Sequence, residues 1–531
     1  MAIENLITEH IDVWTSAVKT KSTSGRGSSK KLELYGVKKL RELILELAVR
    51  GKLVPQDPND EPASHLLVES LKEKDVLIKK GIVKKSRSKK TIKEEHFYDY
   101  PASWVVSRLE DLINVVNGRA YKKAEMLSEG TPILRVGNLF TSNDWYYSDL
   151  QLEADKYIDN GDLIYAWSAS FGPFIWDGGK VIYHYHIWKM DIFRETSLDK
   201  EFSKLFLQAI SERIKASGNG IAMIHMTKER MEKVMHPLPP INEQKQIVNR
   251  VNELMTLCDQ LEQQTESSID AHQVLVTTLL DTLTNSADAD ALMQNWARIS
   301  EHFDTLFTTE ESIDQLKQTI LQLAVMGKLV HFGADPMEAY VKDVISFGPR
   351  NGLSPKEVQV DTGIKVLKLG ATSYGSLNLD ESKSVDVDIE KTSHLWLKKG
   401  DILIQRGNSA NYVGCNCLVK EDVCDVIYPD LMMKIRPSKT VSSEFLSTWL
   451  SSPMAREFMW TRMTGTSGTM PKISKKVVEA IPIIVPSRKI QDIIVSKVEE
   501  LFSICELLKQ LISETQQTQS QLTDTIVEQA V

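Results

Sequence analysis

One helical segment occurs twice in the sequence. Residues 40–54 read LRELILELAVRGKLV and residues 316–330 read LKQTILQLAVMGKLV, with ten identities in fifteen aligned positions and no gap. A shorter match upstream, EHID at 9–12 against EHFD at 301–304, extends the likeness towards the first residue. An internal duplication has to be recognised first, because it decides how the whole chain is divided into structural parts.

Further matches follow in the same order in each half. ILRVG at 133–137 aligns with VLKLG at 366–370, and GDLI at 161–164 aligns with GDIL at 400–403. Around them, short β-branched and aromatic runs alternate with Gly, Asn and Asp, which is the pattern of strands joined by turns. Each half therefore contains a predicted α+β domain of ordinary size.

A long predicted helix ends each half, after a glycine-rich loop (218–229 and 465–476) and a proline-flanked apolar run. Its apolar positions alternate in spacing between four and three residues, which is the heptad seam of a helix that needs a partner helix. These positions are Ile247, Val251, Leu254, Cys258 and Leu261 in the first half, and Ile494, Val498, Leu501, Cys505 and Leu508 in the second.

The same seam is interrupted in both helices. It meets Thr265, Ser268 and His272 in the first copy before leucine returns at Leu275 and Leu279. Two interpretations remain open at this stage: a solvated stretch of the helix, or a place where the helix of another subunit docks.

The duplication divides the chain into five predicted regions. They are an amino-terminal helical region with a basic linker (1–99), a first α+β domain (100–240), a central helical region (241–334), a second α+β domain (335–486) and a carboxy-terminal helix (487–531). The first region includes residues 72–95, with eight lysines or arginines between Lys79 and Lys93, which we interpret as a linker or a phosphate-tracking arm.

Composition sets limits on the class of protein. With no apolar run of membrane-spanning length and no signal-like start, we expect a cytoplasmic protein without a membrane partner. Five cysteines are few and odd in number, which disfavours a disulfide framework. A net charge of -8 argues against a uniformly basic surface, although it does not say where the charges lie.

Several of these motifs together resemble a known family. The LAVxGKLV helices, the PLPPxxEQKxIV start of the long helix (237–248), the GDxL strands and the Asn-Gly pairs (117–118 and 351–352) have the character and order seen in the specificity subunits of type I restriction-modification systems. The resemblance covers essentially the whole chain. It implies an α+β fold in which two target recognition domains are separated by two long antiparallel coiled-coil helices, with a pseudo-two-fold internal repeat.

The resemblance also implies a division of labour. The chain would recognise an asymmetric, two-part target on double-stranded DNA, and would join two modification (methyltransferase) subunits and the restriction (motor-nuclease) subunits. It would itself be non-catalytic, with no cofactor or metal of its own, whereas S-adenosylmethionine, ATP and Mg would act on the partner subunits. The long extension at 1–99 departs from the commoner pattern, so its role stays open.

Catalytic motifs are missing from the sequence. There is no Asp/Asn-Pro-Pro-aromatic loop of the kind that holds a flipped base for amino-methylation, and GRGSSK at 25–30 lacks the spacing of a phosphate-binding loop. The ExK triplet at 381–383 has no convincing partner aspartate before it. These absences count against the alternative of a stand-alone restriction or modification enzyme.

Zinc sites are not expected either. The spacings of Cys415 with Cys417, and of His184 with His186, are not those of structural zinc ligands. His186 and Asp430 precede apolar runs in the two halves, and we interpret them as equivalent framework positions. The paired, diverged loops of the two domains count against a third possibility, a coiled-coil scaffold that does not bind DNA.

Base readout requires polar side chains on loops that reach the groove edges. Three loops recur in the two halves: 117–123 with 350–356, 167–173 with 406–412, and the glycine-rich pair. About half of the candidates should contact phosphates or nothing, because most protein–DNA hydrogen bonds go to the backbone. The candidates are Arg119, Lys122, Lys123, Trp167, Ser168, Asn219 and Lys228 in the first domain, and Arg350, Asn351, Arg406, Asn408, Asn411, Ser467 and Lys472 in the second.

Overall fold

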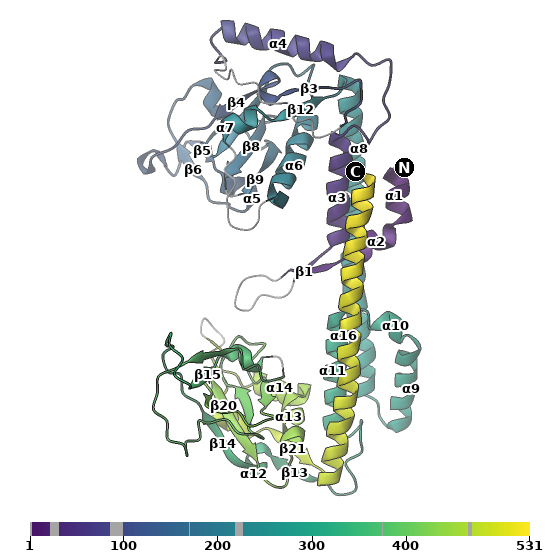
Figure 1. Cartoon of the computed structure of the whole chain (residues 1–531), viewed down its shortest axis with the longest axis vertical. Coiled ribbons are helices and arrows are strands. Elements are labelled where there is room, and N and C mark those ends of the chain that lie inside the picture. The colour runs from purple at the N-terminus through teal and green to yellow at the C-terminus, as the bar shows by residue number, and fades with distance from the viewer. Residues whose placement is uncertain are drawn as a thin grey trace. The chain divides into compact units, whose positions relative to one another are not determined.

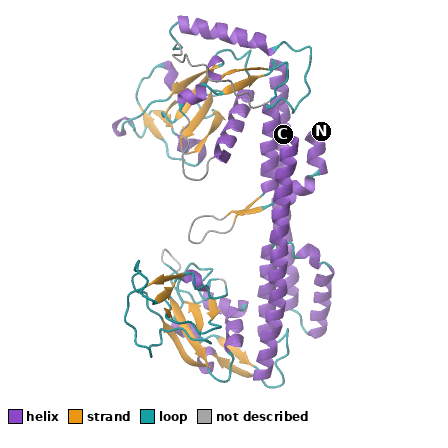
Figure 2. Cartoon of the chain, viewed as in Figure 1, coloured by secondary structure: helices purple, strands orange, loops and turns teal. Residues whose placement is uncertain are grey.

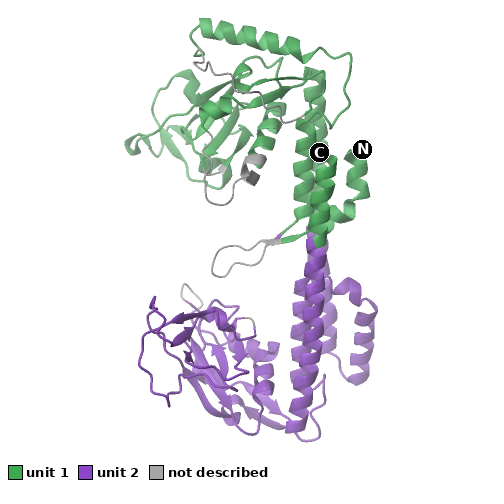
Figure 3. Ribbon diagram, in the orientation of Figure 1, with its two compact units in different colours: residues 1–19, 33–265, 518–531 green, residues 20–32, 266–517 purple. Residues whose placement is uncertain are grey.

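The chain forms two compact units, coloured separately in Figure 3. Unit 1 consists of residues 1–19, 33–265 and 518–531, and unit 2 of residues 20–32 and 266–517. The computed structural model describes residues 3–21, 31–84, 99–168, 170–217, 227–373, 375–465 and 470–531. Among the helices of these ranges, none combines the length and the apolar character needed to cross a membrane.

Unit 1 contains a mixed α/β domain built on two four-stranded sheets and a strand pair (Figures 1 and 2). The first sheet has the order β4 (Ile113–Asn117), β11 (Ile187–Ile192), β8 (Leu163–Ser168) and β9 (Ser170–Ile175). The second has the order β6 (Tyr146–Ser148), β5 (Thr131–Leu134), β10 (Val181–Tyr183) and β7 (Tyr157–Ile158). The pair is β12 (Met235–Leu238) with β3 (Val105–Arg108).

Unit 2 repeats this topology with different strands. Its main sheet has the order β14 (Ile345–Asn351), β20 (Met432–Pro437), β17 (Ile402–Gln405) and β18 (Asn416–Leu418). Its smaller sheet has the order β16 (Ser382–Ser384), β15 (Lys365–Leu367) and β19 (Val426–Ile427), and its strand pair is β13 (Met337–Tyr340) with β21 (Pro482–Val485). In both units the second sheet contains one parallel pair of strands, β5 with β10 and β15 with β19. The predicted α+β fold with an internal repeat is confirmed.

Several helices also correspond between the units, but the helix at 63–79 has no counterpart in unit 2. Those of unit 1 are α1 (Ile3–Glu9), α2 (Ile11–Ser16), α3 (Tyr35–Val49), α4 (Ala63–Lys79), α5 (Val136–Phe140), α6 (Lys200–Ser217) and α7 (Lys228–Glu232). Those of unit 2 are α9 (Ala289–Glu301), α10 (Phe303–Leu306), α11 (Glu310–Val325), α12 (Val341–Val344), α13 (Ser443–Ser451), α14 (Pro453–Trp460) and α15 (Lys475–Glu479). Two long helices, α8 (Ile241–Thr284) and α16 (Arg488–Ala530), contribute residues to both units. A further strand pair is β1 (Lys19–Lys21) with β2 (Lys31–Glu33).

Part of the predicted basic linker is helical. Residues 72–79 belong to α4, which Lys74 attaches to the domain through an ion pair with Asp111 (2.9 Å) and a position over the ring of Phe193. These contacts, rather than the charge of the segment, decide its conformation. Residues 85–98 lie outside the described residues.

The duplicated GKLV sequence ends one helix and caps another. Gly51 and Gly327 have φ values of +71° and +68°, which only glycine adopts without strain at a helix end. In unit 2, Nζ of Lys328 then donates to the carbonyls of Thr284 (2.6 Å) and Ser286 (2.8 Å), where α8 ends. In unit 1, Nζ of Lys52 donates to the carbonyl of Val531 (2.7 Å), just after α16. A lysine is favourable there because carbonyls at a helix C-terminus carry partial negative charge.

The predicted helical seam is buried where it begins. Ile247, Val251, Leu254 and Cys258 are at most 1% exposed. Beyond the interruption the buried position moves from the predicted Leu275, which is 50% exposed, to Val276. Eighteen residues separate Cys258 from Val276, which is five turns of a straight α-helix at 3.6 residues per turn rather than a strict heptad repeat.

The long helices run antiparallel in each unit. In unit 1, Tyr35 at the start of α3 bonds to Asp524 and Arg50 after its end bonds to Val531, so α3 runs parallel to α16. Arg41 of α3 pairs with Asp259 of α8, and Gln56, beyond α3, bonds to Glu243 near the start of α8, so α3 runs antiparallel to α8. In unit 2, the pair Lys317–Glu506 corresponds to Arg41–Asp259 of unit 1. Together with the pair Asp314–Lys509 it sets α11 antiparallel to α16.

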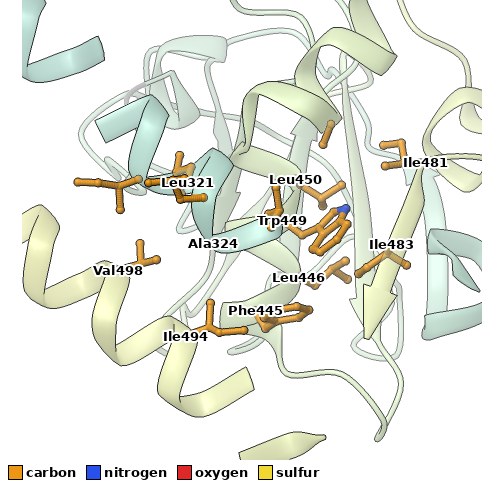
Figure 4. Close-up of a cluster of buried hydrophobic side chains, with 14 of the residues drawn as sticks. Leu321, Ala324, Phe445, Leu446, Trp449, Leu450, Ile481, Ile483, Ile494 and Val498 are labelled. Atoms are coloured by element: carbon orange, nitrogen blue, oxygen red, sulfur yellow. The ribbon is translucent and has the colours of Figure 1, made fainter. Parts of the chain in front are cut away.

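A buried glutamine fixes each domain to its long helix. Gln244 is 0% exposed; its Oε1 accepts from the backbone N–H of Asp199, and its Nε2 donates to the carbonyls of Ser197 and Pro239. Gln491 makes the same three bonds at the equivalent positions, to the N–H of Ser442 and the carbonyls of Thr440 and Pro486. Figure 4 shows apolar side chains of α13 and α16 in one cluster, among them Phe445, Trp449 and Ile494.

Candidate nucleic-acid interface

A short connection between the two sheets is the centre of the candidate interface in each unit. In unit 1 it is His184–Tyr185–His186, between β10 and β11, and in unit 2 it is Pro429–Asp430–Leu431, before β20. We call these residues the crossover segment. Each follows a fully buried tyrosine, Tyr183 or Tyr428. The hydroxyl of Tyr428 donates to the carbonyl of Arg350 (3.2 Å), and that of Tyr183 donates to the carbonyl of Asp155 (2.8 Å), with the carbonyl of Val116 at 3.5 Å.

The Asn-Gly pair packs against the crossover segment from one side. The N–H of Gly118 donates to the carbonyl of Ile187 (3.2 Å), and the N–H of Gly352 donates to that of Met432 (3.3 Å). A Cβ atom at Gly118 would lie 2.4 Å from the carbonyl oxygen of His184, and one at Gly352 would lie 1.9 Å from that of Tyr428. The close approach of two backbones therefore explains why glycine occurs in both copies.

The segment after the GD strand packs against it from the other side. The N–H of Trp167 donates to the carbonyl of His186 (3.1 Å), and the N–H of Arg406 donates to that of Leu431 (2.8 Å). In unit 2 the third predicted loop joins them, because the N–H of Ile473 donates to the carbonyl of Arg406 (2.9 Å) and Lys472 pairs with Gly407. The predicted segments thus converge on one connection in each unit.

These bonds correct one predicted equivalence. His186 and Leu431 accept equivalent hydrogen bonds, so Asp430 corresponds to Tyr185 and not to His186. The sequences around them do not show this offset, because the two connections share no side chain. Tyr185 is 40% exposed and Asp430 is also exposed, so neither is a buried framework position.

In the first predicted loop of unit 1, Arg119 is held by the domain itself. Its guanidinium makes two hydrogen bonds to Glu125, at 2.7 and 3.2 Å, and lowers the pKa of that carboxyl group. The guanidinium must leave this pair before it can use the same fork on a base. Lys122 and Lys123, beside the short 3-10 helix Lys123–Glu125, are exposed and available to phosphates.

The second predicted loop of unit 1 is not a loop. Trp167 and Ser168 end β8 and pair with Phe171 and Ser170 of β9 in a tight hairpin. Edge pairing of the two strands overrides the turn signal of the Gly-Pro pair at 172–173. The indole N–H of Trp167 donates to the carbonyl of Tyr185 (2.9 Å), so this donor is already used within the domain.

Arg350 and Asn351 also lie on a strand where the sequence predicts a loop. Both belong to β14 and pair in register with Lys434 and Met433 of β20. The Arg350 side chain is exposed, whereas Asn351 is half-buried. Pairing in the main sheet thus extends to the Asn-Gly pair itself.

The remaining candidates of unit 2 fall into two groups. Asn408 is engaged internally: its Nδ2 donates to Oε1 of the buried Gln405 (2.7 Å), and its Oδ1 accepts from the N–H of Ser409 (2.7 Å). Asn411 and Lys472 are exposed, and Arg406 is half-buried. We therefore expect Asn408 to hold the segment in shape while the other three face solvent.

Three candidates lie at or beside the third loop. Lys228 begins α7 and pairs with Glu232 (3.4 Å) one turn later. Asn219 and Ser467 lie outside the described residues.

The GD motif has a partner that sequence analysis did not find. Asp162 pairs with Lys189 (2.8 Å), and Asp401 pairs with Lys434 (3.0 Å) and with Arg436. Each aspartate also accepts from a backbone N–H three residues earlier, at Asp159 or Lys398. The sequence does contain a signal for these pairs, namely a lysine at the same position of β11 and β20. Because the residues that flank the two lysines differ, their equivalence is not visible in the sequence alone.

The crossover segment of unit 1 carries two histidines. Burial, together with the neighbouring His186, lowers the pKa of His184 to about 4, so its ring is neutral at physiological pH and is no cation for phosphate. The rings of His184, Tyr185 and His186 lie 4.0 to 4.8 Å apart. In the described part of the chain, no three His, Cys, Asp or Glu side chains gather as ligands of a metal ion.

Comparison with known proteins identifies the family. A family model described as the type I restriction modification DNA specificity domain matches residues 101–271 and again residues 337–517. The chain is 33% identical over 598 residues to the specificity subunit of the type I restriction enzyme EcoEI from Escherichia coli, with 100% of each chain covered. It is 34% identical over 593 residues to that of EcoAI from Escherichia coli, also with 100% of each covered.

A solved chain from a study of complex assembly and conformational transition of the type I restriction-modification system has a TM-score of 0.45 and 18% identity, over 82% of this chain and 98% of that one. Specificity subunits of these systems are non-catalytic, so the chain is not an enzyme by itself. Because the family model matches twice and the relatives match over their full length, the chain belongs to the specificity subunits of type I restriction-modification enzymes.

Proposed function

We propose that unit 1 and unit 2 each bind one half of an asymmetric, two-part target on double-stranded DNA. One observation carries this proposal: both units build the same backbone frame around the crossover segment but place different side chains on it. A common frame fixes how a duplex is approached, while different exposed groups select different bases. Neither a stand-alone enzyme nor a scaffold without DNA is supported by the family.

The contacts divide by chemistry. Lys122, Lys123 and Lys472 suit phosphates, because an exposed ammonium group is a flexible point charge. Lys228 would suit a phosphate once it leaves its pair with Glu232. Arg350, Arg406 and Asn411 are the side chains best suited to base edges, since each carries donors that face solvent or are half-buried. Arg119, Trp167 and Asn408 position the frame unless DNA displaces their internal partners. Asn351 lies on β14, and its buried Oδ1 accepts no hydrogen bond within the described residues.

The partners follow from the family and from the repeat. Two modification subunits would bind the two like helical regions, and restriction subunits would complete the enzyme. S-adenosylmethionine, ATP and Mg would act on those subunits in the cytoplasm, where the target DNA lies. Helix packing that is the same in both units offers two copies of one partner equivalent surfaces.

Exchange of residues 335–486 for the same region of another specificity subunit tests the two-reader proposal. The complex with its modification subunits should methylate a target in which one half is new and the other half is unchanged, as read by sequencing methylated adenines in cells. The isolated chain, as a control, should transfer no methyl groups. A change in both halves of the target would refute the assignment of one half-site to each domain.

Removal of one heptad from the helix at 247–279 tests the spacing between the half-sites. A heptad of α-helix is about 10 Å long, which is about three base pairs of duplex. We expect a shorter spacer or loss of methylation. An unchanged spacer at unchanged affinity would assign the spacing to the modification subunits instead.

A further inference from the structure

We infer that the crossover segment itself reads bases, with Tyr185 and Asp430 as specificity-determining residues of the first and the second half-site. The inference rests on the proposed function, because it takes the two domains to be the readers. It adds two residues that sequence analysis did not select, one of which, Asp430, was interpreted as framework. Their equivalence follows from paired backbone hydrogen bonds on both sides of the segment, to Gly118 and Trp167 in unit 1 and to Gly352 and Arg406 in unit 2.

The backbone around Tyr185 is fixed while its side chain is free to reach outward. Its N–H donates to the carbonyl of Arg119 (3.0 Å), and its own carbonyl accepts from the indole of Trp167 (2.9 Å). The residue nevertheless remains 40% exposed, with its ring beside those of His184 and His186. A rigid backbone that presents a half-exposed aromatic ring loses little conformational entropy when the ring packs against a base.

The backbone N–H of Asp430 is also bonded, but to a side chain. Its N–H donates to the hydroxyl of Ser354 (3.1 Å), and one carboxylate oxygen accepts from that hydroxyl. The other oxygen has no partner within the described residues and the side chain is exposed. A serine across the loop therefore orients the carboxylate without using all of its acceptors.

The chemistry of the two side chains predicts different bases. An ionised carboxylate only accepts, and the donors on the major-groove edges are the amino groups of cytosine and adenine. Asp430 should therefore select one of these two bases in its half-site. The ring of Tyr185 suits an apolar contact such as the methyl group of thymine, and its hydroxyl can donate or accept.

Two cationic residues lie on segments whose backbones are bonded beside the crossover segment of unit 2. Arg406 is anchored to Leu431, the next residue, and Lys472 pairs with Gly407 beside it. The backbones of these two cationic residues therefore belong to the same frame as Asp430. A lone aspartate facing phosphates without such neighbours would weaken binding of every sequence equally.

Asp430→Asn, Tyr185→Ala and the control Glu421→Gln test the inference in the complete complex with modification subunits. Asp430→Asn removes one charge, keeps the size and can still accept from Ser354, and Glu421→Gln removes one charge from an exposed residue of the same unit. The readout is the base preference at each specified position of the methylated sites in cells. Asp430→Asn should reduce discrimination at one base pair of the second half-site by about tenfold or more. Tyr185→Ala should do so only in the first half-site, and Glu421→Gln at neither.

Each half-site serves as the folding control for the other. Unchanged preference at every position, with methylation retained, would overturn the inference. If Asp430→Asn abolished methylation, the base preference would be measured instead by selecting randomised duplexes that bind to the purified complex. An unaltered preference among the bound duplexes would again overturn the inference. The proposed function fails separately, namely if the wild-type complex methylates no two-part site at all.

Discussion

The two units keep their interior contacts and change their outer ones. Gln244 and Gln491 make the same three hydrogen bonds, and Gly118 and Gly352 make the same close approach, although the domains share little sequence. Tyr185 and Asp430, in contrast, differ in size, charge and hydrogen-bonding capacity on the same frame. The contacts that attach a domain to the helices are therefore constrained, whereas those that face outward are free to diverge.

The largest effect should follow removal of the buried glutamines. Gln491→Leu leaves the N–H of Ser442 and two carbonyls without partners in the interior, and each such group costs about 1 to 3 kcal/mol. We expect a loss of about 4 kcal/mol in the free energy of unfolding of unit 2, measured by urea denaturation. Gln244→Leu should cost unit 1 the same amount. Gln246→Leu, at an exposed position of the same helix, is the control and should change little.

Unequal losses of stability for Gln244→Leu and Gln491→Leu would contradict the view that the two units depend equally on these bonds. They would mean that one unit satisfies the released groups by another route, with water or a shifted loop, and that the shared bonds are not equally important. A loss below about 1 kcal/mol in both would show that the bonds are replaced in either unit.

The second comparison concerns the GD ion pairs, which differ in burial. Lys434 and Asp401 are 1% and 0% exposed, whereas Lys189 and Asp162 are 18% and 25% exposed. Burial lowers the pKa of Lys434, although the neighbouring Asp401 opposes the shift. Removing one partner of a buried pair leaves an uncompensated charge, while an accessible pair is screened by solvent.

Lys434→Met should therefore destabilise unit 2 by about 3 kcal/mol, and Lys189→Met should destabilise unit 1 by about 1 kcal/mol. Arg436 still contacts Asp401 and limits the first loss. Urea denaturation measures both, with the exposed Lys399→Met as control. If the two losses are equal, burial does not distinguish the two pairs.

A third difference between the units is a buried residue in the two-stranded pair, β12 with β3 in unit 1 and β13 with β21 in unit 2. His236 of β12 is fully buried between Ser203 and the carbonyl of Pro237, at the position that Ile483 occupies in β21. Burial lowers the pKa of His236 to about 4 from its ordinary 6.5. Because the unfolded chain binds the proton more readily, stability from this group is present above pH 6.5 and is lost as the pH falls towards 4.

Unit 1 should therefore lose about 2 kcal/mol more than a His236→Ile variant between pH 7 and pH 5. The variant carries the residue type of unit 2 and keeps His184, whose pKa is also lowered, so the difference isolates His236. Urea denaturation at the two pH values measures it. Parallel pH dependence of the two proteins would show that His236 is not titrating in the folded state.

The sequence predicted the parts of the fold that the repeat marks. The LAVxGKLV helices, the strands after each GD pair and the beginning of the buried seam follow from periodicity and from local motifs. The later seam shifted from Leu275 to Val276 because the helix keeps 3.6 residues per turn, which a heptad count does not follow.

The candidate site was harder to predict, for a physical reason. Arg350 is a strand residue because its partner strand, β20, lies far away in the sequence, whereas Trp167 and Ser168 pair with the neighbouring strand β9 in a hairpin. Loop signals report only local preference, and sheet pairing overrides them. Tyr185 and Asp430 could not be aligned because backbone hydrogen bonds, which leave no trace in the side chains, define their equivalence.

The smallest predicted effect concerns two charged positions on paired helices, whose signs are reversed between unit 1 and unit 2. Lys509 of α16 pairs with Asp314 of α11, whereas the equivalent positions in unit 1 are Glu262 and Lys38, which pair with Arg41 and Glu33 instead. Lys509→Glu sets two carboxylates against each other and should cost unit 2 about 0.5 to 1 kcal/mol, since exposed pairs are weak. Adding Asp314→Lys restores an attractive pair with the signs of unit 1 and should recover most of the loss. Thermodynamic coupling in this double-mutant cycle, measured by urea denaturation at low salt, would show that either orientation of charge holds the helices together. Additive losses would instead show that the two charges do not interact, and that their opposite signs in the two units reflect some other constraint on the helices.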